Sequence, residues 1–294
     1  MWRPNKCGWL LLVLNSRRCW SWPFNFSLVA NLVWRPGVVT SYMKVRTLQA
    51  VHVRTPDEAA FNAALAAVKA DPAHFHFGRG LFSETALPLA LAKMRPVILA
   101  PDKIRAGMAD LRMLMLRHGV TTTADMATGI FAGFDVEAGL IRSAFEAPGC
   151  AARIDLVPMA NELDKVSDLD AWHTAARGRV EGDHVRLPRR VKLFADGAYF
   201  GQNMRMNPPG YADGHLGKWI TEPTDFTRQV RRYWEAGFSL HIHVNGDEGL
   251  DVVLNTLEPV ITGMRSARQA VTLEHLGYST EAQNRRISRL GLSV

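Results

Sequence analysis

The sequence has 294 residues, 47% of them hydrophobic, which is enough to bury a substantial core in one large domain or two small ones. A mean hydropathy of -0.07, without any apolar run near ~20 residues, argues against a membrane span, and three scattered cysteines without a CxxC pair argue against a disulfide framework or a zinc ribbon. The net charge of +7 resides in the first 56 residues, which contain eight Lys or Arg and no acid, so residues 57–294 hold 27 basic and 28 acidic side chains and predict no nucleic-acid partner.

The first 45 residues resemble a targeting segment only in part. Five tryptophans lie within the first 34 residues, and an apolar run at 8–14 follows two basic residues, as in a signal peptide. No small-residue cleavage site follows that run, and the tryptophans and prolines fit an organelle transit peptide poorly. We expect residues 1–45 to be a basic, Trp-rich head that is disordered or non-native, in a cytoplasmic protein; if the head is a signal peptide, the protein is exported instead.

The next segment begins with a helix signal. Residues 56–69 are Ala-rich, with acids in the first turn and a lysine in the last, and Pro72 ends the pattern. His74 and His76 then form an HxH pair. This pair is a weak metal motif, because no strand signal leads into it and glycines follow at once.

From residue 101 onwards, helix and strand signals alternate. Such alternation predicts a parallel α/β fold, and the absence of GxGxxG and GxxxxGK[ST] motifs gives no support to a nucleotide-binding fold. The fold class that we predict is a partial (β/α)8 barrel with about five strands. Strands are expected at 120–126, 153–159, 191–197, 239–244 and 271–275, and helices at 102–118, 136–146, 169–176 and 226–236 and from 247 and 280 onwards.

One lysine and two histidines lie on consecutive predicted strands. Lys192 is costly to bury unless a group pairs with it or uses it, although a lysine at a strand end can also reach water. His243 and His275 end the next two strands, and carboxyl ends of parallel strands share one edge, so the three residues form a metal-site pattern. His241 alternates in phase with His243, and we expect it to pack or to support a ligand rather than to bind metal.

A loop of more than twenty residues, 198–220, follows the Lys192 strand, and loops of that length are usually functional. Asp196, just before this loop, either orients a ligand or caps the turn. Glu274 alternates onto the face opposite His275, where helices are expected, and its position suggests no role. The candidates for substrate contact are Asp196, Asn203, Arg205, Tyr211 and His215.

Four segments, in order, resemble the amidohydrolase superfamily, and specifically its family 3 branch of metal-dependent amide and formamide hydrolases. The sequence VKLFADG at 191–197 matches that branch's fourth-strand motif, and HVNGD at 243–247 resembles its HAIGD at strand five. LEH at 273–275 resembles RIEHA at strand six, and GVTTTADM at 119–126 resembles GITTVADM. The resemblance extends over residues 78–294 and implies the barrel fold of that superfamily.

The resemblance implies roles for three residues. Lys192 would take up CO2 to become a carbamate that bridges two metal ions, and His243 and His275 would bind the second ion, for which zinc suits the donor set. Two features of the family are missing: its first-strand HxH is not found, and its general-base aspartate would lie beyond Val294. We therefore expect a chain truncated at both ends, with residues 46–101 as a remnant of the accessory region and 102–294 as an incomplete barrel.

These features predict a protein like the metal-dependent amidohydrolases. It would hydrolyse a non-peptide amide or formamide C–N bond of a small molecule through a metal-activated water, with impaired activity in this fragment. The alternative is a non-catalytic remnant or binding protein on an incomplete barrel. Neither interpretation predicts an oligomeric state.

Overall fold

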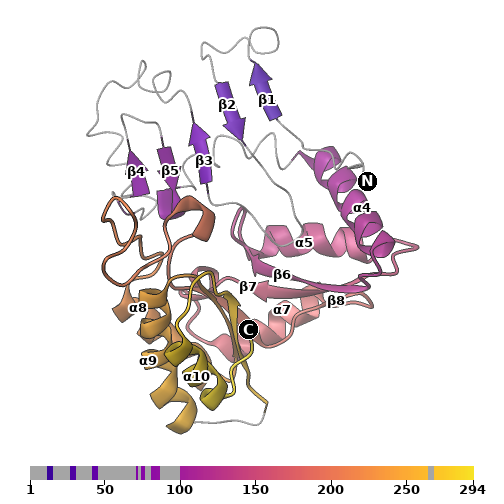
Figure 1. Cartoon of the computed structure of the whole chain (residues 1–294). Helices are drawn as coiled ribbons and strands as arrows, with labels where there is room; N and C mark the ends of the chain where they lie inside the picture. Colours follow the sequence, from indigo (N-terminus) through magenta and orange to yellow (C-terminus); the bar gives the residue numbers. More distant parts are fainter. Residues whose placement is uncertain are drawn as a thin grey trace. The chain divides into compact units, whose positions relative to one another are not determined.

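The computed structural model describes residues 100–263 and 268–294, together with short pieces of the first 99 residues (Figure 1). The chain divides into two compact units, residues 1–97 and 98–294. The division into segments at 45 and 101 that the sequence suggests stays a prediction.

In the first unit, short strands form an antiparallel sheet with the order β1-β2-β3-β5-β4. Three of them lie in the segment for which the sequence predicts disorder, whereas the helix predicted at 56–69 lies outside the described residues. His74 of the HxH pair is buried, with Nδ1 2.5 Å from the hydroxyl of Thr85; the side chain of His76 is outside the described part. The elements are β1 (Leu12–Asn15), β2 (Ser27–Ala30), β3 (Tyr42–Val45), β4 (Phe75–His76), β5 (Leu81–Ser83) and the 3-10 helix η3 (Glu84–Ala86).

The second unit alternates helices and strands in the predicted order. Each of the five expected strands is present. The elements are α4 (Pro101–Arg117), β6 (Thr122–Thr128), α5 (Phe134–Phe145), β7 (Arg153–Pro158), α6 (Ala160–Leu163), α7 (Leu169–Val180), β8 (Val185–Arg186), β9 (Arg190–Phe194), the 3-10 helix η4 (Tyr199–Gly201), α8 (Pro223–Glu235), β10 (Ser239–Val244), α9 (Asp247–Gly263), β11 (Val271–His275) and α10 (Glu281–Leu290).

Every strand pair in the second unit is parallel. Strands β6, β7 and β8 form one sheet, and β9, β10 and β11 form another. A parallel bridge between Met159, just after β7, and Lys192 in β9 joins the two sheets. The parallel strands with intervening helices confirm the predicted partial (β/α) barrel. Strand β8 was not expected, because its two residues are too few to show an alternating pattern.

Two apolar cores hold the strands against their helices. Strands β9–β11 pack against α8, α9 and α10, which lie together in Figure 1, and Leu240 and Ile242 of β10 are fully buried there. The second core joins β7 to α5 and α7, with Leu156 and Phe145 at 0% exposure. Each such side chain contributes roughly 1.5–3 kcal/mol to folding. The two cores fix the strand ends that carry the polar residues.

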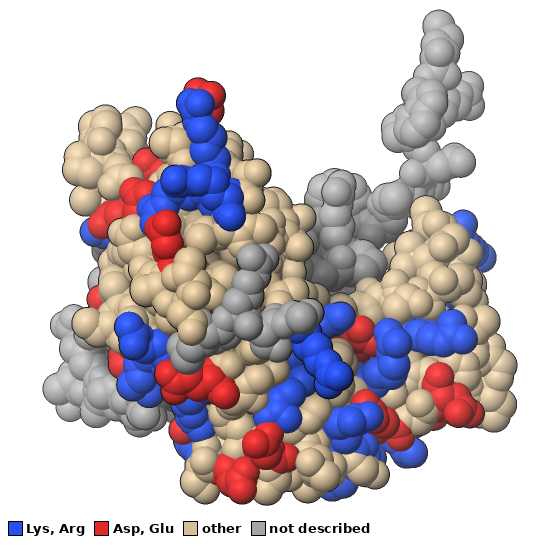
Figure 2. Space-filling view, turned by 90° about the horizontal axis from the view of Figure 1, so that it is seen from below, with Lys and Arg blue, Asp and Glu red and all other residues tan. Residues whose placement is uncertain are grey.

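The surface shows no dominant sign of charge on the face seen in Figure 2, where Lys and Arg lie interspersed with Asp and Glu. Within the part of the chain that the structure describes, no helix combines the length and the apolar character that crossing a bilayer requires.

Candidate metal centre

Lys192 lies in the middle of β9 with only 2% of its surface exposed. Its ammonium forms an ion pair with the carboxylate of Glu274 on β11 and lies 5.2 Å from the ring centre of Phe194. Burial lowers the pKa of Lys192 to about 7. The ion pair with Glu274 acts in the other direction, because it favours the charged ammonium.

His243 and His275 meet at the carboxyl ends of β10 and β11. Their ring centres lie 4.6 Å apart, with an angle of 70° between the planes. The strand register pairs His275 with Val244, so strict alternation would send the two rings to opposite faces. His275 instead adopts a φ of 78°, and this left-handed backbone ends the strand pattern at His275 itself. The departure from strand geometry brings the two imidazoles together.

Both imidazoles are held in the neutral form. Burial lowers the pKa of His275 to about 4, and the charge of Lys192 adds to the effect. Burial is also the main reason why the pKa of His243 lies well below its ordinary value, and the electrostatic effects of His275 and Lys192 lower it further. Neutral imidazole is the form that binds a metal ion, because its unprotonated nitrogen supplies the lone pair.

The two imidazoles supply donor nitrogens that suit a divalent cation. Two neutral imidazoles are in contact, and the charge of Lys192 is close enough to lower the pKa of both. Among the described residues, no three His, Cys, Asp or Glu side chains form a group able to hold a metal ion.

Glu274 occupies a position that differs from the expectation. The register pairs it with His243, so it faces the same side of the sheet as Lys192 and His241 rather than the helices. One carboxylate oxygen contacts Lys192, and the other lies 2.9 Å from Nδ1 of His241. The expectation for Glu274 was wrong, because it assumed that His275 keeps the regular alternation and faces the metal site. His241 thus contacts a carboxylate, and burial lowers its pKa to about 4, with smaller effects from Arg190 and Lys192.

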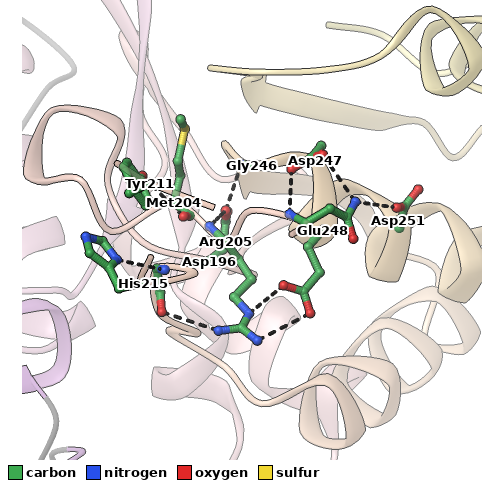
Figure 3. Close-up of polar contacts among 11 residues, drawn as sticks. Asp196, Met204, Arg205, Tyr211, His215, Gly246, Asp247, Glu248 and Asp251 are labelled. Carbon is green, nitrogen blue, oxygen red and sulfur yellow. Dashed lines mark hydrogen bonds and ion pairs between the residues drawn. The ribbon is translucent and has the colours of Figure 1, made fainter. Parts of the chain in front are cut away.

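Asp196 fastens the loop 198–220 to the end of β10. It is fully buried and accepts backbone N–H groups from Arg205 (2.7 Å), Asn245 (2.8 Å) and Gly246 (2.8 Å), as Figure 3 shows in part. Burial raises the pKa of Asp196 to about 7, against the effect of these donors. Both of its oxygens are therefore engaged by the backbone, which favours the turn-capping alternative over direct contact with a ligand.

The same loop is bound to the first turn of α9. The guanidinium of Arg205 forms an ion pair with Glu248, with Nε 2.8 Å from the carboxylate, and lies 5.3 Å from the ring centre of Trp219. The carboxylate of Asp247 accepts the backbone N–H of Asn207 at 2.9 Å and its side-chain amide at 3.2 Å (Figure 3). These contacts order the loop although it contains little regular secondary structure.

The other loop candidates occupy different places. Asn203 is buried, and its carbonyl accepts the backbone N–H of Lys218 at 2.8 Å. Tyr211 stacks on the exposed ring of His215 with ring centres 4.3 Å apart, and its hydroxyl donates to the carbonyl of Met204 at 3.3 Å. Burial raises the pKa of Tyr211 to about 12. Tyr211 and His215 therefore interact with each other and with the loop.

Asn245 is a residue of the site that the sequence analysis missed. It is 3% exposed, and its side-chain nitrogen lies 3.0 Å from Nε2 of His243 and 3.1 Å from the carbonyl oxygen of Gly197. The alternation rule was the available signal, because it places Asn245 on the same face as His243 two residues earlier.

Parallel strands that carry a buried lysine and two histidines in contact define a partial (β/α) barrel with a candidate metal centre. Residues 46–294 match the model of the Amidohydrolase family, so the chain belongs to that family. The match to its family 3 branch confirms the resemblance noted in the sequence.

Two solved structures share the fold. An uncharacterized metal-dependent hydrolase from Pyrococcus horikoshii OT3 superposes with a TM-score of 0.55 and 20% identity, over 78% of this chain and 44% of that one. Another from Pyrococcus furiosus gives a TM-score of 0.54 and 20% identity, over 78% of this chain and 46% of that one. The chain thus spans less than half the length of either structure. No curated protein matches the sequence.

Proposed function

We propose that this chain carries part of the active site of a metal-dependent hydrolase that cleaves a non-peptide amide or formamide C–N bond of a small molecule. The observation that carries the proposal is the contact between the neutral rings of His243 and His275 beside the buried amine of Lys192. Family membership and the two structures described as metal-dependent hydrolases agree with it.

The first step needed is the modification of Lys192. Its neutral amine would attack CO2, forming an N–C bond and losing one proton to solvent, which leaves a carbamate. The low pKa of Lys192 favours this reaction because only the unprotonated amine is nucleophilic. The carbamate would then hold a divalent ion, with zinc as our candidate, together with His243 and His275.

A divalent ion at these residues would lower the pKa of a water molecule and polarise an amide carbonyl. The residues of this chain would position the substrate around it. Arg205 and Asn203 belong to the loop that Asp196 holds against the strand ends, and Tyr211 and His215 form a stacked pair farther along it. We assign this loop to substrate binding, with Asp196 as its anchor.

One observation favours a second candidate, a non-catalytic binding protein. Lys192 is already paired with Glu274, and within the described part no three His, Cys, Asp or Glu side chains gather into a metal-holding group. A chain in which this ion pair persists would bind metal weakly and would not hydrolyse amides.

Zinc binding distinguishes the two. We expect the purified chain, given zinc and bicarbonate, to retain zinc in elemental analysis and to show a carbamate carbon signal by NMR with 13C-bicarbonate. His243→Gln and His275→Gln should lose the zinc, whereas His118→Gln, at an exposed helix end, should retain it. If the wild-type protein retains no zinc, the proposal is contradicted. Turnover of N-acyl or formamide substrates excludes the non-catalytic alternative.

The cytoplasmic location stays a prediction.

A further inference from the structure

A groove with a volume of about 610 Å³ lies between α7 and the segment 186–190, which leads from β8 into β9. Among the described residues that line it, none is a candidate metal ligand, so the groove is separate from the candidate metal centre. Two of its lining side chains are acids, Asp155 and Glu181. Four are arginines, namely Arg177, Arg186, Arg189 and Arg190.

Asp155 holds two of these arginines in place. It is 7% exposed, and its Oδ1 atom accepts from both Nε and Nη2 of Arg186 at 2.8 Å. Its Oδ2 atom lies 3.3 Å from Nη1 of Arg190. The side chains of Arg186 and Arg190 are 56% and 39% exposed. Because a guanidinium carries five N–H donors, each of the two has N–H groups beyond those that contact Asp155 and can donate them to a further acceptor.

The other two arginines add positive charge to the groove. Arg177 pairs with Glu181, with Nη2 2.8 Å from the carboxylate, and Arg189 pairs with Asp170, which is 76% exposed and outside the lining. Their charges act on His173, which also lines the groove. Burial lowers the pKa of His173, and Arg189 and Arg177 lower it further, against two backbone hydrogen bonds. With His173 neutral, the lining has four positive and two negative side chains, an excess of two positive charges.

A concave surface with an excess of positive charge attracts anions. Guanidinium groups suit phosphate in particular, because their paired N–H donors match its oxygen atoms. The volume lies within the roughly 300–1,000 Å³ that is usual for sites of small ligands. We propose that this groove binds a dianionic phosphate group, free or carried by a small soluble molecule, with Arg186 and Arg190 as its main donors. This second site goes beyond the proposed hydrolase activity and needs no metal ion.

Isothermal titration calorimetry of the full chain with inorganic phosphate tests the site, at fixed ionic strength and with a chelator present. We expect saturable binding to the wild-type protein. Arg186→Gln removes a charged donor, so it should raise the phosphate Kd about 10-fold. Arg228→Gln, which removes an exposed arginine of α8 that is also paired with a carboxylate, should leave the Kd unchanged. Methyl phosphate as a second probe distinguishes the free ion from a phosphate ester by the tighter Kd of the two.

Glu181→Gln tests the sign of the charge in the groove. Oε1 of Glu181 accepts the backbone N–H of Leu187 at 3.0 Å, and the glutamine oxygen can keep this bond. The substitution removes a negative charge and releases Arg177 from its ion pair, so phosphate should bind on the order of 2- to 5-fold more tightly. If Arg186→Gln does not fold, this shift decides alone.

The site fails independently of the proposed function. The phosphate Kd should be the same in His243→Gln as in the wild-type protein, because His243 does not line the groove. If the wild-type protein binds no phosphate saturably, or if the Kd is unchanged in folded Glu181→Gln, the proposal of a phosphate site is overturned. A phosphate Kd that rises in His243→Gln would place the bound phosphate at the candidate metal centre and would also overturn it.

Discussion

Lys192 and Glu274 form an ion pair across the intervening strand β10, although 82 residues separate them in the sequence. Glu274 bridges Lys192 to His241, so one carboxylate links all three strands of this sheet. A carbamate on Lys192 would be negatively charged and would repel Glu274. The ion pair and the metal-binding form of Lys192 are therefore mutually exclusive, and the balance between them decides whether Lys192 can take part in binding a metal ion.

Lys192→Met should make the stability of the protein depend less on pH. Because burial lowers the folded-state pKa of Lys192 to about 7, well below that of an exposed lysine, the unfolded state binds the extra proton between about pH 7 and pH 10. The contribution of Lys192 to stability therefore rises with pH across this window, by up to about 1.4 kcal/mol per pH unit.

Urea unfolding of wild type and variant at several pH values measures this effect. The stability of Lys192→Met relative to wild type should be greatest at pH 7 and should decrease towards pH 10. Lys103→Met, at an exposed position in α4, should show no such trend. A difference between Lys192→Met and wild type that stays constant with pH would show that the amine titrates as an ordinary lysine.

Glu274→Gln should lower the pKa of Lys192 further. The substitution removes the negative charge that stabilises the ammonium and leaves burial unopposed. NMR titration of the 13C-methylated lysines, with Lys192 assigned from the Lys192→Met variant, follows this pKa directly. Glu281→Gln, at an exposed position in the first turn of α10, is the matched control. A pKa for Lys192 that rises in Glu274→Gln would mean that the ion pair does not hold the proton on the lysine.

The barrel strands could be predicted because their apolar runs and intervening helices are local patterns. Lys192 and His243 could be named as candidates from their positions on those strands. The position of Glu274 could not be predicted, because the positive φ of His275 breaks the alternation from which the face of Glu274 was inferred, and no residue type in the sequence signals that φ. The contacts of Asp196 were equally hidden, since its partners are backbone N–H groups from residues 9 to 50 positions away.

Asp196→Asn should loosen the loop 198–220. In asparagine, an NH2 group replaces one of the two carboxylate oxygens, and it cannot accept a hydrogen bond. If it replaces Oδ2, the N–H groups of Arg205 and Gly246 lose their acceptor. If it replaces Oδ1, the N–H group of Asn245 loses its acceptor. Leaving a buried donor unpaired costs about 1–3 kcal/mol. Urea unfolding measures the loss, and faster hydrogen exchange at Arg205 and Gly246 would locate it. Asp213→Asn, in the exposed part of the same loop, should change neither; an unaltered exchange rate in Asp196→Asn would count against the anchoring role.

Gly246→Ala should displace the same loop by a steric route. A Cβ atom at Gly246 would lie 1.9 Å from the carbonyl oxygen of Arg205, and a backbone atom cannot yield as the end of a flexible side chain can. The carbonyl of Arg205 also accepts the N–H of Glu248 at 3.1 Å, so moving it breaks the junction between the loop and α9. We expect a loss of about 1–3 kcal/mol, in the range of overpacked cores.

Gly139→Ala is the same substitution at another position, and it should raise the stability of the protein instead of lowering it. Gly139 lies inside α5 with no atom within 4 Å of the added methyl group, so alanine should stabilise that helix by roughly 0.5–1 kcal/mol. Thermal or urea unfolding of both variants compares them directly. If Gly246→Ala proved as stable as wild type, the close approach of the backbone of Arg205 to the end of β10 would be wrong, and with it the junction between the loop and α9.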